Sequence, residues 1–247
     1  MNTSKSTTAI DPKGKLAYRK IAVITGVIFI IATLMGPILA APLLPDLTGT
    51  DFLTLVSANP IQAAGGVLFS IIGYLACAGI AVVMYPVLKK WNAGLALGSV
   101  VFRTIETAFY MVGLVALMSL LKLGQRFTTA AAADRTSLQA IGNLLVSIRD
   151  YAALLAVFAF CLGAFMYYYL FFQSRLIPRW LSGFGIVAII LITVACVLAL
   201  FSGNRITSYI SLAAPIAVQE MVLAVWLIVK GFNPKAIADH NVKDVEG

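Results

Sequence analysis

The chain has 247 residues, of which 61% are hydrophobic and 11% are charged, and its formal net charge is +8. Soluble domains are roughly half apolar and about a quarter charged, whereas disordered chains are rich in charge. The composition therefore excludes a water-soluble globular protein and a disordered chain. It predicts a protein with several membrane-spanning segments.

Six apolar stretches are long enough to cross a membrane as helices. A transmembrane helix needs about 20 apolar residues to span a hydrocarbon layer of roughly 30 Å. The stretches that reach this length are residues 21–44, 61–88, 93–121, 150–173, 180–202 and 207–230. The sequence therefore predicts an all-α fold, a polytopic membrane helix bundle with six transmembrane helices. Residues 21–232 are expected to form this single transmembrane domain.

The positions of Lys and Arg predict the orientation of the helices, because cytoplasmic loops carry an excess of these residues. Residues 1–20 are a basic leader that contains Lys5, Lys13, Lys15, Arg19 and Lys20. Lys and Arg also gather after the second, fourth and sixth stretches. We therefore expect both termini to be cytoplasmic, including a short solvated tail at residues 233–247. The net positive charge is thus a topology signal, and we expect no nucleic-acid partner.

Two connections on the opposite side are longer than turns. Residues 47–59 contain Thr50-Asp51 as a helix-start signal and end before Pro60, which predicts a short interfacial helix. In residues 130–148, apolar side chains recur at helical spacing. That segment is either an amphipathic helix on the outer surface or an outward extension of the fourth spanning helix. Both alternatives are left open.

Aromatic residues lie near the cytoplasmic ends of several stretches. Trp91 and Trp180 stand at the start of the third and fifth stretches, and Tyr167-Tyr168-Tyr169 lies near the end of the fourth. Trp and Tyr are enriched where a membrane meets water. We therefore expect these residues to belong to an interfacial aromatic belt.

The cysteines and the single histidine do not indicate a metal or cofactor site. Cys77, Cys161 and Cys196 lie inside apolar stretches, so we expect small packing residues and not a disulfide framework. His240 stands alone in the polar tail, whereas a zinc site needs several ligands together. We therefore predict no metal and no cofactor.

A few polar side chains lie deep within the apolar stretches: Arg103 and Glu106 in the third, and Gln219 and Glu220 in the sixth. Charges inside spanning helices are costly and generally face a bundle interior or a cavity. Counted from the basic residues at the inner ends of their stretches, Arg103 and Glu220 lie roughly 20 Å and 15 Å along their helices. Because Arg cannot lose its proton, Glu220 at similar depth is its predicted counter-ion.

Further polar residues extend this cluster. Tyr110 lies one turn beyond Glu106 on the same helix face, and Arg149 and Asp150 stand at the outer start of the fourth stretch. Two carboxylates and one guanidinium leave one charge unbalanced, so either one Glu holds a proton or a further cation joins. The predicted binding residues are Arg103, Glu106, Gln219, Glu220, Tyr110, Arg149 and Asp150.

Three interpretations of the cluster are left open. In the first, the cluster fixes helix register and is purely structural. In the second, it binds a polar or ionic ligand or relays a proton. In the third, it is catalytic, but the sequence shows no nucleophile–base pair. We therefore predict no catalytic residues and favour a protein that is not an enzyme.

Four segments are jointly distinctive: Phe102-Arg103-x-x-Glu106, Tyr85-Pro86-Val87-Leu88-Lys89-Lys90, residues 174–181 and residues 219–227. Together they resemble a prokaryotic family of six-helix membrane proteins that is known only as a domain of unknown function. The resemblance covers about residues 18–232. It implies a multi-pass protein of the bacterial plasma membrane with a single six-span domain, and it implies no activity.

The leading hypothesis is an intramembrane pocket that binds an anionic or zwitterionic small molecule or a lipid headgroup, with proton-coupled transport as one form of this function. Arg103 would anchor the anion, one Glu would be its counter-ion and the other would carry a proton. The alternative is a non-catalytic membrane partner or sensor with a structural cluster, and the third is a lipid-modifying enzyme. The expected partners are membrane lipids and a small-molecule ligand, and the oligomeric state is left open.

Overall fold

The structure is a computed structural model that describes residues 12–246, and no β-strand occurs in that range. Residues 1–11 of the predicted leader and Gly247 of the predicted tail lie outside the described residues. The helices are α1 (Pro12–Thr33), η1 (Leu34–Ala40), η2 (Ala41–Leu43), α2 (Phe52–Ala58), α3 (Pro60–Leu88), α4 (Ala93–Thr129), α5 (Ala132–Ser174), α6 (Arg179–Ser202), η3 (Ile206–Tyr209), α7 (Ile210–Val229) and α8 (Pro234–Glu246). Of the short elements, η1 is π-helical, and η2 and η3 are 3₁₀-helical.

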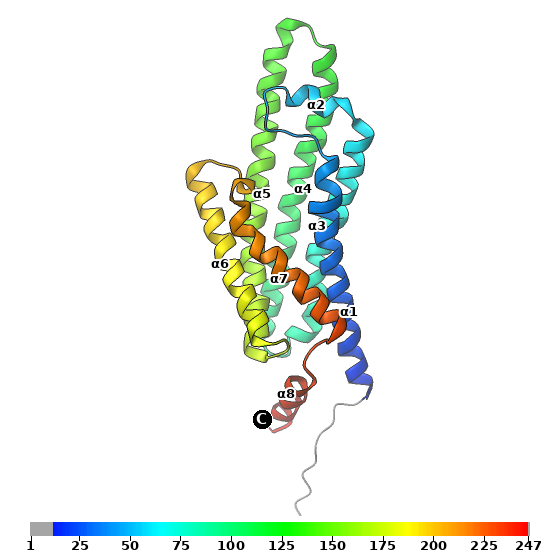
Figure 1. The fold of residues 1–247 in the computed structure, drawn as a ribbon, viewed down its shortest axis with the longest axis vertical. Helices are drawn as coiled ribbons and strands as arrows, with labels where there is room; N and C mark the ends of the chain where they lie inside the picture. Colours follow the sequence, from blue (N-terminus) through cyan, green and yellow to red (C-terminus); the bar gives the residue numbers. More distant parts are fainter. Residues whose placement is uncertain (1–11, 247) are drawn as a thin grey trace, which may run out of the picture.

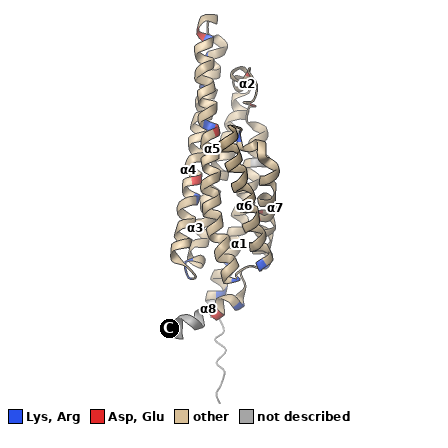
Figure 2. Ribbon diagram, turned by 90° about the vertical axis from the view of Figure 1, so that its left-hand side faces the viewer, with Lys and Arg blue, Asp and Glu red and all other residues tan. Residues whose placement is uncertain are grey.

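Six of these helices are long and apolar enough to cross a membrane. They are α1 with its continuation through η1 and η2, then α3, α4, α5, α6, and η3 with α7. Charged residues are scarce along the middle of the bundle and gather toward its ends (Figure 2). The predicted all-α fold is therefore confirmed, with six helices that are long and apolar enough to span a membrane. The first spanning helix starts earlier than predicted, because α1 already includes the second half of the basic leader.

The six long helices are arranged in a ring. Along the chain each helix packs against the next, from α1 to α3, α4, α5, α6 and α7, and α7 packs back against α1. In Figure 1, α7 runs obliquely across the front of the bundle and meets α1 near the lower end. A ring of this kind encloses an interior that all six helices line.

The two ends of the ring differ. One end carries α2 and the turn at η3, and the other carries α8, the start of α1 and the end of the chain (Figure 1). We call them the α2 end and the α8 end. Toward the α8 end the interior is filled by large apolar side chains, among them Phe29, Ile80, Met84 and Leu223, which are all at most 1% exposed.

The structure decides the predictions for the two long connections, residues 47–59 and 130–148. Residues 130–148 form no separate helix, because α5 is a single helix of 43 residues and about 64 Å. The extension of the fourth spanning helix was thus the better of the two alternatives. The short helix predicted in residues 47–59 is present as α2, which packs against α4. There Gly124 allows the approach, since a Cβ at this position would lie 2.6 Å from the Leu53 carbonyl oxygen.

The described part of the predicted solvated tail is helical, and one of its side chains is buried. Residues 234–246 form the helix α8, and Ile237 is only 2% exposed in the core. Asn233 starts the helix, because its side chain accepts the Lys235 backbone N–H at 3.1 Å and its own N–H donates to the Leu176 carbonyl at 2.8 Å. His240 Nε2 also lies 2.7 Å from the Lys90 carbonyl oxygen. One buried side chain and a few polar contacts hold α8 against the bundle, and the polar composition of the segment did not predict these contacts.

We expect Ile237→Asp to release α8 from the bundle. Burial of an isoleucine contributes about 1.5–3 kcal/mol, so the released population should rise more than about tenfold. Limited proteolysis of the purified protein measures this as faster cleavage within residues 233–247. Lys235→Asp introduces the same side chain on the exposed side of α8 and should leave the cleavage rate unchanged. Equal rates for the two variants would contradict the docking.

Candidate functional site

A cavity of about 400 Å³ lies inside the ring, and all six spanning helices line it. A volume of this size is within the range of small-molecule sites. Most of the lining is apolar, but Arg103, Glu106 and Tyr110 of α4 reach it, as do Arg149 of α5 and Glu220 of α7. The cavity therefore brings together five of the seven residues that the sequence singled out.

The deep part of the cavity holds an ion pair. Arg103 Nη1 lies 2.9 Å from Glu106 Oε2, and the two residues are 2% and 3% exposed. We predicted Glu220 as the counter-ion, but the ion pair of Arg103 within the described chain is with Glu106. The reason is local, because residues three apart on a helix share one face. A partner on the same helix needs no precise packing between helices.

This ion pair leaves hydrogen-bonding capacity unused. Arg103 Nε donates to the Cys77 carbonyl oxygen at 3.2 Å, and the guanidinium carbon lies 4.9 Å from the centre of the Phe160 ring. Nη1 of Arg103 and Oε2 of Glu106 are buried and face each other in the ion pair. The other polar atoms at the ends of these side chains, Nη2 of Arg103 and Oε1 of Glu106, form no hydrogen bond with a described residue. Because polar groups inside proteins are usually hydrogen-bonded, two such atoms on residues that line a cavity are suited to hold a ligand.

Close packing of α4 and α5 positions this pair. A Cβ at Gly163 would lie 3.1 Å from Arg103 Cγ and 3.2 Å from the Arg103 backbone nitrogen. Glycine therefore lets the two helix backbones approach at the level of the ion pair. α5 is therefore in close contact with the base of the Arg103 side chain.

Glu220 lines the same cavity from α7, next to a buried tyrosine. Tyr167 Oη donates to Glu220 Oε1 at 3.5 Å. Gln219 points instead toward α5 and α6, where Tyr168 Oη donates to its Oε1 and its Nε2 donates to the Leu181 carbonyl oxygen at 3.1 Å. Gln219 thus joins three helices, and Glu220 is the carboxylate of α7 that faces the cavity.

The predicted tyrosine belt is wrong for two of its three members. Tyr167 and Tyr168 are fully buried in the bundle, and Tyr169 is 38% exposed. α5 packs against α4 on one side and α6 on the other, so two of three successive side chains face protein. One feature of the sequence did point to a buried tyrosine. Glu220 lies inside an apolar stretch, and an interior carboxylate needs a nearby hydrogen-bond donor, which Tyr167 supplies.

A stacked tyrosine pair separates the cavity from a second, smaller one. The rings of Tyr74 and Tyr110 are 4.4 Å apart and nearly parallel, and Thr107 Oγ1 donates to the Tyr74 carbonyl at 2.8 Å. Beyond them, toward the α2 end, lies a space of about 260 Å³ that we call the vestibule. Both tyrosines and Arg149 line both spaces. They form the partition between the vestibule and the cavity.

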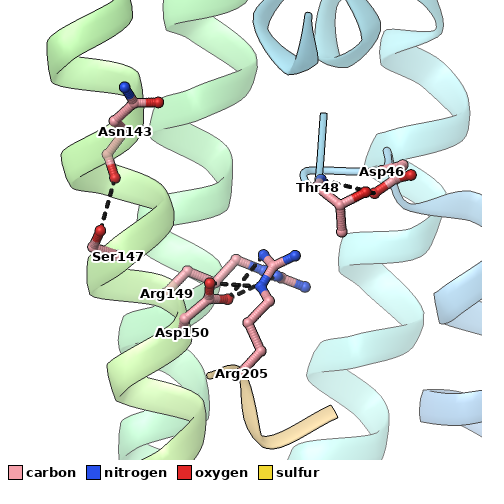
Figure 3. A network of polar contacts seen from close by, with 7 residues as sticks. All are labelled: Asp46, Thr48, Asn143, Ser147, Arg149, Asp150 and Arg205. Atoms are coloured by element: carbon pink, nitrogen blue, oxygen red, sulfur yellow. Dashed lines mark hydrogen bonds and ion pairs between the residues drawn. The ribbon is translucent and has the colours of Figure 1, made fainter. Parts of the chain in front are cut away.

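The vestibule contains its own charged network (Figure 3). Arg205 donates to both oxygens of Asp150, at 2.6 and 3.0 Å, and Arg149 Nη1 lies 3.6 Å from Asp150 Oδ1. Asp46 accepts two hydrogen bonds from Thr48, at 2.7 and 2.9 Å, and these bonds lower the pKa of the Asp46 carboxyl below its ordinary value. Asp150 therefore belongs to the vestibule, whereas Arg149 stands at the boundary.

We expect Arg205→Met to have a small effect on stability. The Arg205 and Asp150 side chains are 28% and 25% exposed, and ion pairs that water reaches contribute about 1 kcal/mol or less. The free energy of unfolding in detergent should therefore fall by at most about 1 kcal/mol. The loss should shrink in high salt, which screens such pairs. A large, salt-independent loss would show that the vestibule is closed to water.

The charged groups lie at two depths. Phe160 is level with Arg103, and Arg149 precedes Phe160 by eleven positions on α5, which corresponds to about 16 Å along the helix. The deep part contains Arg103, Glu106 and Glu220, and the shallow part contains Arg149. Within the described chain, no group of three or more His, Cys, Asp or Glu side chains is arranged to hold a metal ion.

The arrangement of six long apolar helices around an interior with a few charged side chains indicates the class of polytopic helical membrane proteins. The family model described as "Domain of unknown function (DUF4386)" matches residues 24–231, and the chain belongs to this family. The resemblance seen in the sequence is thereby confirmed. No curated protein and no solved structure matches the chain.

Proposed function

We propose that the protein binds a small zwitterionic or anionic molecule, or a lipid headgroup of that charge, in the cavity of the six-helix ring. The observation that carries this proposal is the buried Arg103–Glu106 pair, which faces an empty volume with hydrogen-bonding capacity unused. A ligand that carries an anionic group would satisfy the guanidinium, since charge-assisted hydrogen bonds are the strongest that side chains form.

The set of charges favours a zwitterion over a simple anion. Two guanidinium groups, of Arg103 and Arg149, and two carboxylates, of Glu106 and Glu220, line the cavity. With all four ionised, their charges cancel, so a ligand with both signs of charge adds no net charge to a low-dielectric interior. A proton on one Glu would shift this preference toward an anion.

A purely structural role is less well supported. Arg103 does contact two neighbouring helices, through the Cys77 carbonyl and the Phe160 ring, but its ionic partner Glu106 lies on the same helix. Uncharged groups also make bonds between helices here, such as Thr107 to the Tyr74 carbonyl and Gln219 to the Leu181 carbonyl. Contacts between these helices therefore do not require a second charge at Glu106.

We also propose a location and an orientation. The α8 end carries Lys and Arg at several helix ends, for example Lys89, Lys90 and Lys230, and cytoplasmic ends are rich in these residues. Both termini would then be cytoplasmic, in the plasma membrane of a bacterium, and the vestibule would face outward. Transport would require the filled α8-end half to open, so binding is the function that this geometry supports.

Ligand-dependent unfolding of the purified protein in detergent tests the proposal. The probes are phosphoethanolamine, inorganic phosphate and dihexanoyl-phosphatidylethanolamine. At least one should raise the midpoint of thermal unfolding, because a ligand that binds only the folded state stabilises it. Glu220→Gln should weaken that binding about tenfold.

Asp134→Asn is the matched control, since it removes one exposed carboxylate from α5 far from the cavity. It should bind the probe as the unmodified protein does. The proposal fails if no probe shifts the midpoint at any pH and Glu106→Gln behaves like the unmodified protein throughout. That result would leave the structural role as the better explanation.

A further inference from the structure

We infer that the ligand is a zwitterionic phospholipid, and that its headgroup enters the cavity sideways from the bilayer, between η1 and α7. This inference rests on the proposed function and adds the substrate class and the route. The inference follows because α1 and α7 are in contact toward the α8 end, whereas η1 and α7 make no substantial contact nearer the α2 end.

The ring closes between α1 and α7 only toward the α8 end. The substantial contacts of α7 in the described chain are with α1, α6 and η3, and those of η1 are with α1, α3 and η2. Figure 1 shows α7 leaning away from the upper part of the first helix, toward α6. The cavity lies at this level, since its lining includes Gly36 and Ala40 of η1 on one side and Ala217 of α7 on the other.

The residues on both sides of this opening are small. Ala217 lines the cavity and is an exposed residue, as a residue at the mouth of the cavity would be. A Cβ placed on Gly36 would meet no described atom within 4 Å. Ile38 and Val218, on the same two helices, do not line the cavity and are 54% and 57% exposed, as expected of a surface in contact with acyl chains. We call the opening between Gly36 and Ala217 the lateral opening.

The wall at η1 is also irregular. η1 is a π-helix of seven residues that includes Gly36 and Pro37. Proline donates no backbone hydrogen bond, and π-helical turns occur frequently at functional sites. A wall of this kind can adjust to a headgroup more readily than a regular helix.

The charges of the cavity match the headgroup. The phosphate of a phospholipid suits the guanidinium of Arg103, and the ammonium of phosphatidylethanolamine suits the carboxylate of Glu220. Arg103 and Glu220 are both in the deep part of the cavity, which the lateral opening reaches through apolar residues. The acyl chains would then remain in the bilayer beside η1 and α7, and only the headgroup would be enclosed.

The route through the vestibule is less direct. The stacked rings of Tyr74 and Tyr110, together with Arg149, stand between the vestibule and the deep charges. A water-soluble ligand would have to displace this partition. A lipid that enters through the lateral opening would not.

Two probes with the same headgroup distinguish the routes: dihexanoyl-phosphatidylethanolamine and its chain-free analogue glycerophosphoethanolamine. Isothermal titration of the purified protein in detergent measures the affinity for each. We expect the lipid to bind at least about tenfold more tightly, because only the lipid also contacts the apolar opening. Ala217→Trp should fill the opening and weaken lipid binding about tenfold or more.

Val218→Trp is the matched control, because it adds the same ring one position along α7 at an exposed residue that does not line the cavity. It should leave the affinity for the lipid within about twofold. If Ala217→Trp fails to fold, Gly36→Trp obstructs the opening from the other side, where the structure has room.

The outcomes separate this inference from the proposed function. Equal affinity for the two probes, or lipid binding that neither Ala217→Trp nor Gly36→Trp weakens, would overturn the lateral route while the binding function stands. Binding of neither probe, nor of any probe in the unfolding assay, would overturn both. Tighter lipid binding that the obstructing variants weaken and Val218→Trp leaves intact would support the inference.

Discussion

Replacing Arg103 by methionine is expected to lower the free energy of unfolding by about 3–5 kcal/mol, because it removes one partner of a buried ion pair. Methionine fills much of the same volume, so the loss reflects charge more than packing. Glu106 would then be an unpaired carboxylate that is 3% exposed. Reversible unfolding in mixed detergent micelles, followed by circular dichroism, measures the change. Ligand binding should be lost in the same variant.

The double variant Arg103→Met/Glu106→Gln tests the explanation. It removes both charges, and exchange of a buried ion pair for uncharged groups is often nearly neutral. The double variant should therefore recover most of the stability that Arg103→Met loses. Arg126→Met, on the exposed surface of the same helix, is the control and should leave stability within about 0.5 kcal/mol.

Two other results would contradict this explanation. If Arg103→Met were as stable as the unmodified protein, Glu106 would already be uncharged and the pair would not be ionic. If the double variant were as unstable as the single one, the loss would come from packing around Phe160 and Cys77, which the Arg103 side chain contacts.

The architecture was predictable because it depends on features that are local in the sequence. The length of an apolar stretch decides whether a helix can cross a membrane, and six such stretches appear in the structure as six long helices. The ends were less predictable. α8 was missed because one buried side chain, Ile237, and a few polar contacts hold it, and these depend on where the other helices end.

The site was predictable in its residues and not in its pairing. Arg103 and Glu106 stand out in the sequence because charges are rare in spanning helices. Their direct pairing follows from a spacing of three residues, yet similar depth pointed to Glu220. The depth of a residue in its helix predicts its level in the bundle. It does not predict the direction in which the side chain points, and that direction decides the partner of Arg103.

The partition and the vestibule could not be predicted from the sequence. Tyr74 and Tyr110 are 36 positions apart, and the vestibule joins Asp46 to Arg205 across most of the chain. Such contacts depend on which helices are neighbours in the ring. Periodicity within one helix contains no information about that order.

Gly185→Ala is expected to destabilise the protein by about 1–3 kcal/mol, because it overpacks a rigid part of the interior. A Cβ at this position would lie 2.5–2.9 Å from three atoms of the Tyr168 ring. That ring is fully buried, and its hydroxyl group donates to Gln219, so the side chain cannot move away at little cost. The midpoint of thermal unfolding in detergent measures the loss.

Gly183→Ala is a matched control two positions away on the same helix. The nearest atom to a Cβ there is Phe172 Cε2 at 3.9 Å, which is an ordinary contact. Alanine also favours a helix over glycine by about 1 kcal/mol, so this variant should be as stable as the unmodified protein or slightly more so. Equal effects at the two positions would show that helix propensity dominates. A loss at Gly185 alone would show that glycine is required there to seat Tyr168 against α6, and with it the bond that joins α5 to α7.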